Sequence, residues 1–362
     1  MKILCFIDSL GSGGAQRQLV ELAKGFKEKG HEVSFLTYHS INFFKLELDK
    51  HHIVVKTIIE PNYVKRLLKI RKVIRAEKPD AVLSFLEAAN FMATLAGFPY
   101  RKWKLVVGER SANPTILTNK KLRFYRKAHF FADYIVGNSH KNIELVKKVI
   151  PRLKEKKLKV IYNSVEIPKQ NNFSLPESES TSIVIAASYR AVKNLDGLIE
   201  ALQLLPKEYR DKLKINWYGN ITNENMYYKS QQEKVNQLGL NEVLILNDET
   251  NQIHQKYNNV DFIGLFSHFE GFPNTICEAM AMGKPVIVSK VSEVPLFIKE
   301  NENGFLCDSN HPESIKNAII KAIDSNAKQR EMLGKNNYET AKNQFNKKVI
   351  IDEYLKLLKG EE

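Results

Sequence analysis

Short apolar runs alternate with longer amphipathic stretches along almost the whole chain. The runs in the first half are KILCFID, HEVSFLTY, IVVKTII, AVLSFL, KLVVGE and YIVGN, and amphipathic stretches such as 15–30 and 63–78 lie between them. Parallel strands that helices cover on both faces read as continuous apolar runs of this kind. The alternation therefore predicts an α/β fold with doubly wound parallel sheets.

The alternation stops at residues 169–181, KQNNFSLPESEST, a polar stretch with almost no apolar anchor. A second series follows, with the apolar runs SIVIAAS, KINWYG, VLILN, FIGLFS and PVIVSK. The chain has 362 residues, which is enough for two domains of about 150 residues each. We expect a first domain over 1–168, a linker over 169–181, a second domain over 182–345 and a final helix over 346–362 that packs back on the first domain.

The sequence predicts no membrane span, signal peptide or disulfide framework. Every apolar run is shorter than the stretch of about 18 residues that a transmembrane helix needs. Asp8 also ends the opening run too early for a signal peptide. Three cysteines, Cys5, Cys277 and Cys307, are scattered, odd in number and without zinc-binding spacing. They fit a reducing compartment, so we expect a cytoplasmic protein.

The positive charge lies in the first half of the chain. Residues 1–168 hold 32 Lys and Arg against 15 Asp and Glu, a net charge of +17, while residues 169–362 carry a net charge of −3. A basic surface attracts nucleic acid, anionic lipid or an anionic substrate, and its alternative is a solvated surface without a partner. The asymmetry therefore predicts that the two domains have different partners.

Three glycines follow the first expected strand in the sequence DSLGSGGAQRQ. Gly11, Gly13 and Gly14 let backbone N–H groups approach a phosphate or sugar at the start of a helix. The dinucleotide-binding fingerprint is absent because Gln16 stands where it needs glycine, and no Gly-Lys-Ser/Thr of a Walker A loop follows. The alternative interpretation is a flexible turn.

Two glutamates stand eight positions apart in residues 267–290, with a Gly-Phe-Pro turn between them. Asn274 is a suitable N-cap for a helix that begins at Thr275, and such a helix start offers N–H groups to a diphosphate. Glu270 then lies on the loop and Glu278 about one turn inside the helix, where each can accept hydrogen bonds from sugar or ribose hydroxyls. The alternative is two unrelated surface charges.

Two cations follow the first expected strand of the second domain, in AASYRAVKNLDGLIEAL. Arg190 and Lys193 stand between an apolar run and an amphipathic stretch. Cations at this place can neutralise the charge that grows on a leaving diphosphate. An isolated pair of this kind is otherwise a surface feature.

Five segments together resemble one known family. They are GGAQR at 13–17, YIVGNS at 134–139, KVIYNSVEI at 159–167, RAVKN at 190–194 and EGFPNTICEAMAMGKPV at 270–286. The last segment carries the E-x7-E signature of the family 4 retaining glycosyltransferases, which the chain resembles over nearly its whole length. The resemblance implies the GT-B fold, in which two Rossmann-like doubly wound domains face each other across a cleft.

The resemblance also implies roles for individual residues. Glu278 would bind the nucleotide ribose, Glu270 the hydroxyls of the transferred sugar, and Lys193 the diphosphate. The implied catalytic groups are Glu270, Lys193, Arg190 and Glu109. The implied donor-binding residues are Gly13, Gly14, Gly219, Glu270, Gly271, Phe272, Pro273, Asn274, Thr275 and Glu278.

The sequence departs from the family at two of these places. The family's arginine precedes its lysine by about five residues, where this chain has Ser188, and Arg190 stands nearer to the lysine. Many members have a histidine after the strand that matches KLVVGE, where this chain has Glu109 and Arg110. Glu109 is therefore a candidate for contact with the sugar or the acceptor. The alternative is a structural salt bridge to Arg110 or another neighbour.

The activity that the resemblance implies is sugar transfer from a nucleotide-sugar, by default a UDP-sugar, with retention at the anomeric carbon. No cofactor and no metal are expected, since cations replace the metal, and the chain has no Asp-x-Asp triplet. The expected acceptor is a hydroxyl of a lipid-linked glycan in the synthesis of capsule, O-antigen or a similar surface polysaccharide. A sugar-nucleotide epimerase of GT-B-like fold remains the alternative.

Two basic segments of the first domain predict contact with an anionic membrane. Residues 63–78 place Leu67, Leu68, Ile70, Val73 and Ile74 largely on one face among Lys and Arg, and residues 120–131 mix aromatic residues with cations. We expect peripheral association with the inner face of the cytoplasmic membrane. The alternative is packing of each apolar face on the sheet. Nucleic acid is not an expected partner, because no stacking platform or known module accompanies the charge, and the oligomeric state stays open.

Overall fold

The computed structural model describes residues 1–112, 114–168, 180–222, 224–250 and 252–361. Two compact units divide the chain: Met1–Ser164 with Lys347–Glu362, and Val165–Asn346. The first boundary thus falls four residues before the predicted one. Most of the predicted linker, 169–179, lies outside the described residues, and Thr181 already begins a strand because the apolar run starts there.

The first unit contains a fully parallel sheet. Within the described residues it has seven strands in the order β3-β2-β1-β4-β5-β6-β7. They are β1 (Lys2–Phe6), β2 (Glu32–Thr37), β3 (Val54–Thr57), β4 (Ala81–Phe85), β5 (Lys104–Glu109), β6 (Tyr134–Gly137) and β7 (Leu158–Val160). The order reverses between β1 and β4, and in open α/β sheets ligands bind outside the carboxyl ends of the strands at such a point.

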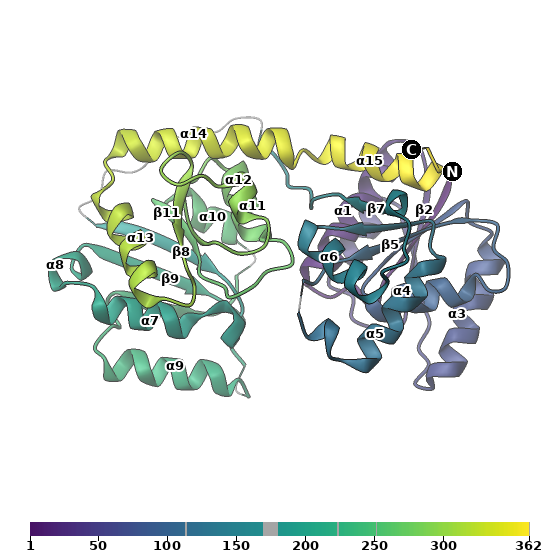
Figure 1. Cartoon of the computed structure of the whole chain (residues 1–362), viewed down its shortest axis with the longest axis horizontal. Helices are drawn as coiled ribbons and strands as arrows, with labels where there is room; N and C mark the ends of the chain where they lie inside the picture. The colour runs from purple at the N-terminus through teal and green to yellow at the C-terminus, as the bar shows by residue number, and fades with distance from the viewer. Residues whose placement is uncertain (113, 169–179, 223, 251, 362) are drawn as a thin grey trace. The chain divides into compact units, whose positions relative to one another are not determined.

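Helices cover both faces of this sheet, which explains its continuous apolar strands. In β1, Ile3 and Cys5 face the core on the side of α1 and α15, whereas Leu4 and Phe6 face the core under α3, α4 and α6. Figure 1 shows α15 on one side of the sheet and α3 and α4 on the other. The helices of this unit are α1 (Gly14–Glu28), α2 (Lys45–Lys50), α3 (Tyr63–Glu77), α4 (Glu87–Ala96), α5 (Lys120–Lys127), α6 (His140–Val149) and α15 (Lys347–Lys359).

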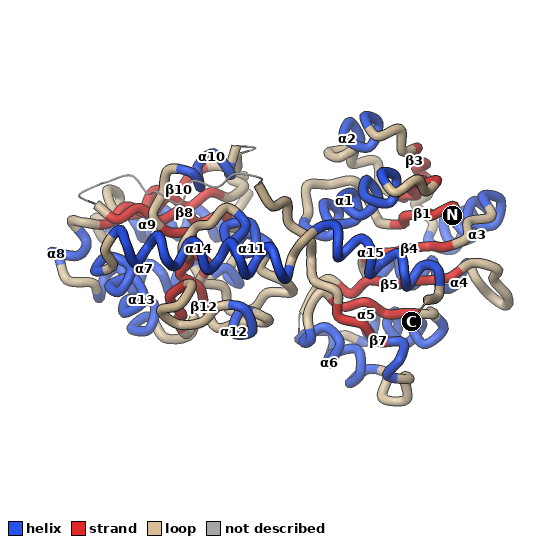
Figure 2. Tube along the Cα trace, turned by 90° about the horizontal axis from the view of Figure 1, so that it is seen from above, coloured by secondary structure: helices blue, strands red, loops and turns tan. Residues whose placement is uncertain are grey.

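The last helix, α15, belongs to the core of the first unit. It contacts α1, β4 and β5, and it crosses over these strands in Figure 2. Its buried face has the helical spacing of the sequence pattern and consists of Ile350, Ile351, Tyr354, Leu355, Leu357 and Leu358. The end of the chain is therefore an integral part of the first unit.

The second unit contains a second parallel sheet, described as six strands in the order β10-β9-β8-β11-β12-β13. They are β8 (Thr181–Ala186), β9 (Leu213–Tyr218), β10 (Leu244–Asn247), β11 (Phe262–Leu265), β12 (Val286–Ser289) and β13 (Gly304–Cys307). The order reverses between β8 and β11. The helices are α7 (Leu195–Leu204), α8 (Lys207–Arg210), α9 (Met226–Gln237), α10 (Ile253–Asn258), α11 (Asn274–Ala281), α12 (Val294–Phe297), α13 (Pro312–Asp324) and α14 (Ala327–Gln344).

The predicted apolar face of residues 63–78 packs mostly on the sheet. Ile70 and Ile74 are buried, and Leu67 and Val73 pack against the same core. Leu68 is the exception, because its position on α3 leaves it 58% exposed. No helix in the described part of the chain is both long enough and apolar enough to span a membrane.

Candidate active site

Two loops meet at the carboxyl edge of the second sheet, one after β8 and one after β11. The backbone N–H of His268 donates to the carbonyl of Val192 at 2.9 Å. Asn194, buried and in a left-handed conformation, donates from its side-chain amide to the carbonyl of Phe266 at 3.1 Å. Since β8 and β11 flank the reversal in strand order, these contacts hold both loops at the place where the fold predicts a ligand.

Lys193 and Glu270 form an ion pair between these loops. The ammonium of Lys193 lies 2.6 Å from Oε1 of Glu270, and the hydroxyl of Ser267 donates to the same oxygen at 2.7 Å. Their side chains are 17% and 13% exposed, so the pair is partly shielded but open to a ligand. Among the described residues, Oε2 of Glu270 accepts no hydrogen bond. A cation and a carboxylate thus stand together with acceptor capacity left for a sugar hydroxyl.

Helix α11 starts one residue earlier than the sequence pattern predicts. Asn274 is its first residue and not its cap, and the cap residue makes no side-chain hydrogen bond to the helix. The cap is Pro273, because its carbonyl accepts the N–H groups of both Ile276 and Cys277. The predicted position of Glu278, about one turn inside the helix, is confirmed.

A histidine of the helix α10 contacts the carboxylate of Glu278. Nε2 of His254 in α10 lies 3.1 Å from Oε2 of Glu278, whose side chain is 17% exposed. In the same first turns of α11, the hydroxyl of Thr275 donates to the carbonyl of Ala186 at 3.2 Å. These contacts fix the start of α11 against the end of β8 and orient the carboxylate of Glu278.

Three further predicted donor residues serve the local fold as well. The ring of Phe272 is buried against Phe297 and Phe345, with ring centroids 6.3 and 5.7 Å apart. Gly271 accepts a hydrogen bond from Ser292 at its carbonyl. Gly219 has no room for a side chain, because a Cβ atom there would lie 2.4 Å from the carbonyl oxygen of Ala187.

Arg190 does not join the Lys193–Glu270 pair. Its side chain is exposed, and its Nε donates to the hydroxyl of Ser188 at 3.0 Å. The two candidates for the place of the family's arginine therefore contact each other. Which of them meets a ligand stays a prediction.

Gly13 and Gly14 stand at the start of α1, in the first unit. Gly13 is the N-cap of the helix and has an extended conformation. A Cβ atom on Gly13 would meet Oε1 of Gln16 at 2.3 Å. The glycine therefore lets Gln16 fold back over the helix start, where its amide donates to Asp8 at 3.0 Å.

Glu109 lies in a buried ion-pair network, the structural alternative of the sequence analysis. Its side chain is 3% exposed, and Oε2 accepts from Nη2 of Arg126 at 2.8 Å. Nδ1 of His129 lies 3.1 Å from the other oxygen. Burial raises the pKa of Glu109, but the charges of Arg126 and His129 outweigh this effect and lower it to about 2. The partner is Arg126 and not the neighbouring Arg110, which donates to Asn163 and Tyr354 instead.

Two protein-family models together match residues 12–340 of the chain. The model described as Glycosyltransferase Family 4 matches residues 12–168, and the one described as Glycosyl transferases group 1 matches residues 166–340. The chain belongs to the family 4 glycosyltransferases. It is therefore a transferase enzyme, and its two parallel-sheet units are those of the GT-B fold.

Similar proteins include enzymes that are named for lipid-linked glycan and capsule synthesis. A Campylobacter jejuni GalNAc-α-(1→4)-GalNAc-α-(1→3)-diNAcBac-PP-undecaprenol α-1,4-N-acetyl-D-galactosaminyltransferase is 25% identical, over 99% of this chain and 98% of its own. The capsular polysaccharide biosynthesis glycosyltransferase CapM of Staphylococcus aureus is 26% identical, over 80% and 79%. The solved structure of Anabaena Alr3699/HepE in complex with UDP and glucose superimposes with a TM-score of 0.84 at 21% identity, over 99% of both chains.

Two residues at the candidate site of this glycosyltransferase, Asn194 and His254, were not predicted from the sequence. Asn194 caps α7, and its amide also reaches the carbonyl of Ser309 at 2.8 Å, so it joins three loops. Its place directly before an amphipathic stretch is a recognisable N-cap signal. His254 has no such signal, because only the packing of α10 beside α11 brings it to Glu278.

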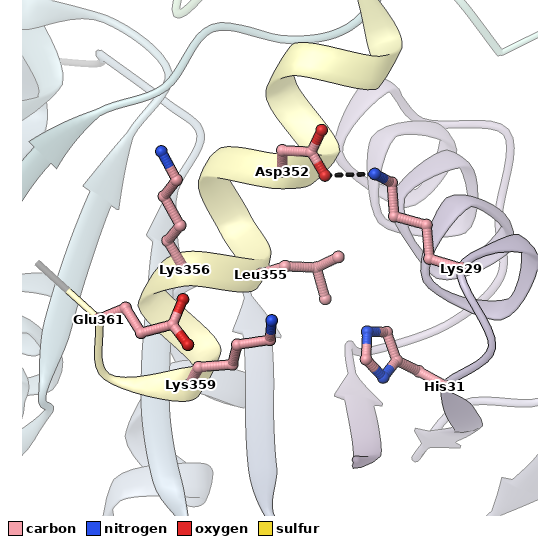
Figure 3. A pocket seen from close by; sticks show the side chains of 7 residues that line it. All are labelled: Lys29, His31, Asp352, Leu355, Lys356, Lys359 and Glu361. Atoms are coloured by element: carbon pink, nitrogen blue, oxygen red, sulfur yellow. Dashed lines mark hydrogen bonds and ion pairs between the residues drawn. The ribbon is translucent and has the colours of Figure 1, made fainter.

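A hollow of about 380 Å³ lies between the end of α1 and α15, away from the predicted site (Figure 3). Lys29 and Asp352 form an ion pair across it. His31 directly precedes β2, so the hollow lies at the amino edge of the sheet, and burial together with nearby cations lowers the pKa of this histidine. None of the predicted site residues lines the hollow, whose lining is Lys29, His31, Asp352, Leu355, Lys356, Lys359 and Glu361.

Proposed function

We propose that this glycosyltransferase moves a sugar from a UDP-sugar to a hydroxyl of a lipid-linked glycan, with retention at the anomeric carbon and without a metal. The observation that carries the proposal is the Lys193–Glu270 pair, whose glutamate stands shortly before α11, the helix that carries Glu278. This constellation offers a cation, helix N–H groups and two carboxylates to one ligand. A nucleotide-sugar has the matching diphosphate, ribose and sugar hydroxyls.

Each group has a distinct task in this proposal. Glu278 accepts hydrogen bonds from the ribose, held in place by His254, and Glu270 accepts from the transferred sugar through its open Oε2. Lys193 retains donors beyond the one that points to Glu270, because an ammonium has three. When the bond to the diphosphate breaks, this cation stabilises the charge that develops on the leaving group.

The metal-independent step rests on Lys193. A partly shielded ammonium at the diphosphate supplies the electrostatic stabilisation that a divalent cation supplies in metal-dependent enzymes. Transfer should therefore continue in excess EDTA. The proton of the acceptor hydroxyl passes to an oxygen of the leaving diphosphate, so neither glutamate needs to form a covalent intermediate.

The acceptor class is proposed from relatives and from charge. The C. jejuni relative is named for an undecaprenyl-diphosphate-linked saccharide, and the S. aureus relative for capsule biosynthesis. The first 168 residues carry a net charge of +17, which suits a diphosphate linked to a lipid in an anionic membrane.

The proposal includes peripheral contact of the first unit with the membrane. Val64 and Leu68, one turn apart on α3, are 63% and 58% exposed, and Phe124 on α5 is 61% exposed. Exposed lysines accompany them, including Lys65 and Lys69. Apolar side chains that enter the interface beside cations favour an anionic bilayer surface.

A transfer screen tests the proposal. UDP-linked glucose, galactose, GlcNAc and GalNAc would each be incubated with short-chain prenyl-diphosphate-linked mono- and disaccharides, and the products analysed by mass spectrometry and NMR. We expect an α-linked product from one donor, and its loss in Glu270→Gln but not in the exposed control Glu155→Gln. A β-linked product would contradict retention. Epimerised donor without transfer would instead support the epimerase alternative.

A further inference from the structure

We propose that Glu87 binds a hydroxyl of the acceptor sugar and that Arg126 and Glu109 position its carboxylate. The inference rests on the proposed function and assigns an acceptor contact to the first unit. In the sequence analysis Glu109 was the candidate for this contact. In the structure the side chain of Glu109 is buried, with 3% exposed. The side chain of Glu87, which shares the ion-pair partner Arg126 with Glu109, is 27% exposed.

Glu87 stands at the reversal of strand order in the first sheet. It is the first residue of α4, which follows β4, and β4 pairs with β1 at this reversal. Asp8 follows β1 on the other side of the same point. The carboxyl ends of these strands form the edge where open α/β sheets bind ligands. Glu87 therefore lies at the reversal of strand order in the first sheet, as the loops after β8 and β11 lie at the reversal in the second sheet.

The buried side-chain amide of Asn90 fixes the start of α4 to the sheet. Asn90 accepts from Ser84 at 2.8 Å and donates to the carbonyl of Gly108 at 3.0 Å, so it ties the helix to both β4 and β5. Leu86, directly before Glu87, has φ 75° and ψ 148°, a conformation that is rare for any residue except glycine. The surrounding packing thus holds the backbone in an unfavourable conformation at the position that presents Glu87.

Arg126 connects the open carboxylate to the buried one. Its side chain is 0% exposed, and its Nη2 lies 2.9 Å from Oε1 of Glu87 and 2.8 Å from Oε2 of Glu109. Oε2 of Glu87 accepts no hydrogen bond from any described residue. One carboxylate oxygen is therefore oriented and the other is left for a ligand.

The network is not completed by the described residues. Nη1 of Arg126 is buried and has no hydrogen-bond partner among them. A buried donor without a partner is unfavourable, and a ligand oxygen or a water molecule that reached this nitrogen would satisfy it. A buried ion pair is also a poor source of stability compared with apolar residues of the same volume. Both observations favour a role in binding over a role in folding alone.

Carboxylate and guanidinium together suit a saccharide. A sugar hydroxyl donates to a carboxylate and accepts from a guanidinium, whereas a phosphate would be repelled by Glu87. The ligand class is therefore the neutral sugar of the acceptor, and not its diphosphate.

Steady-state kinetics with the full chain test the proposal. The donor and the prenyl-diphosphate-linked saccharide would be those found in the transfer screen, with Glu87→Gln, Glu87→Asp and Arg126→Lys compared with Glu155→Gln, a carboxylate that is 77% exposed and precedes β7. We expect Glu87→Gln to raise the acceptor KM about tenfold or more, with the donor KM and the affinity for UDP unchanged. Glu87→Asp should recover part of the loss, and Arg126→Lys should raise the acceptor KM at unchanged UDP affinity.

The outcomes separate this inference from the proposed function. If the acceptor KM of Glu87→Gln were within twofold of the wild-type value, the inference would be overturned and the proposed function would stand. The same conclusion would follow if Glu87→Gln lost as much affinity for UDP as for the acceptor. Absence of transfer by the wild type with every donor would contradict the proposed function. In that case saturation-transfer NMR decides the inference with the same saccharides: contact seen in the wild type and lost in Glu87→Gln supports it, and equal or absent contact overturns it.

Discussion

The proposed donor site depends on close approaches between backbone and side chains that single residues permit. Gly219 directly follows β9, where the carbonyl of Ala187 and the ring of Tyr189 leave no space for a side chain. Tyr189 in turn donates to the carbonyl of Asn247 at 2.7 Å, so the ends of β8, β9 and β10 are joined around the glycine. The loop that carries Lys193 begins from this junction.

Replacing Gly219 by alanine should destabilise the second unit. The new Cβ would lie 2.4 Å from the backbone oxygen of Ala187, and backbone atoms cannot move aside as a side chain can. We expect a loss of about 1–3 kcal/mol in the free energy of unfolding, measured by urea denaturation. The control is Gly11→Ala, whose nearest contacts would be 3.6 and 3.7 Å. Equal stability of the two variants would contradict this packing.

Glu109 should make stability depend on pH in the acid range. Burial raises its pKa, but Arg126 and His129 lower it to about 2, below the value of the unfolded chain near 4.5. A carboxyl group with a lowered pKa stabilises the fold above the unfolded value, and this stabilisation is lost as pH falls from about 4.5 towards 2. The loss for one such group is at most about 3 kcal/mol.

Urea unfolding at several pH values between 5 and 2 measures this contribution. The double variant Glu109→Leu/Arg126→Met removes both charges together, so it avoids an unpaired buried arginine. Its unfolding free energy should fall less steeply with pH than that of the wild type. Parallel curves would show that Glu109 does not have a lowered pKa.

At the scale of elements, strands with a clear apolar run were predictable, including the edge strands β3 and β10, whereas two other edge strands were not. The six runs of the first half and the five of the second all form strands, but β7 and β13 were missed. Both lie at a sheet edge; β7 has only three half-buried residues beside lysines, and β13 begins with glycine. Edge strands pair on one side alone, so their sequences need no long apolar run.

The site was predictable in its residues and not in its contacts. The motif after β11 identified Glu270 and Glu278, and the motif after β8 identified Lys193, but their pairing depends on two strands that meet only in the fold. The partner of Glu109 was left open for the same reason, since Arg126 reaches it from α5. The donor roles of these residues stay predictions until a ligand is bound.

Helices α1 and α15 pack closely because α1 has a glycine at their contact. A Cβ atom on Gly25 would lie 2.0 Å from Cδ1 of Ile351. Gly25→Ala should therefore destabilise the first unit, although alanine favours the helix by about 1 kcal/mol. In thermal unfolding, the double variant Gly25→Ala/Ile351→Ala should be no less stable than Ile351→Ala alone. An additive loss in the double variant would argue against this contact.

At the scale of the whole molecule, charge and apolar exposure coincide in the first unit. A net charge of +17 over residues 1–168 stands against −3 over the rest of the chain. The proposed donor site needs few cations, chiefly Lys193, so in this proposal most of the positive charge is left for other partners. Each basic residue near an anionic bilayer contributes about 1 kcal/mol to attraction.

Vesicle sedimentation tests the membrane contact. The wild type should sediment with phosphatidylglycerol vesicles at low salt and be released at high salt. Val64→Ser/Leu68→Ser/Phe124→Ser should bind more weakly, whereas Leu296→Ser, which replaces a 58% exposed leucine of the second unit, should bind like the wild type. The proposed membrane contact would be contradicted if the wild type did not bind vesicles at low salt. It would also be contradicted if Leu296→Ser lost as much vesicle binding as the triple variant.

The central claim is that the carboxyl edge of the second sheet binds the nucleotide of a UDP-sugar. Calorimetric titration of UDP into the wild type, Glu278→Ala and the control Glu155→Gln tests it most directly. The account predicts saturable binding to the wild type and the control, and a Kd about tenfold or more higher for Glu278→Ala, since a hydrogen bond to a charged group is lost. No UDP binding by the wild type, or equal affinity in all three proteins, would contradict it.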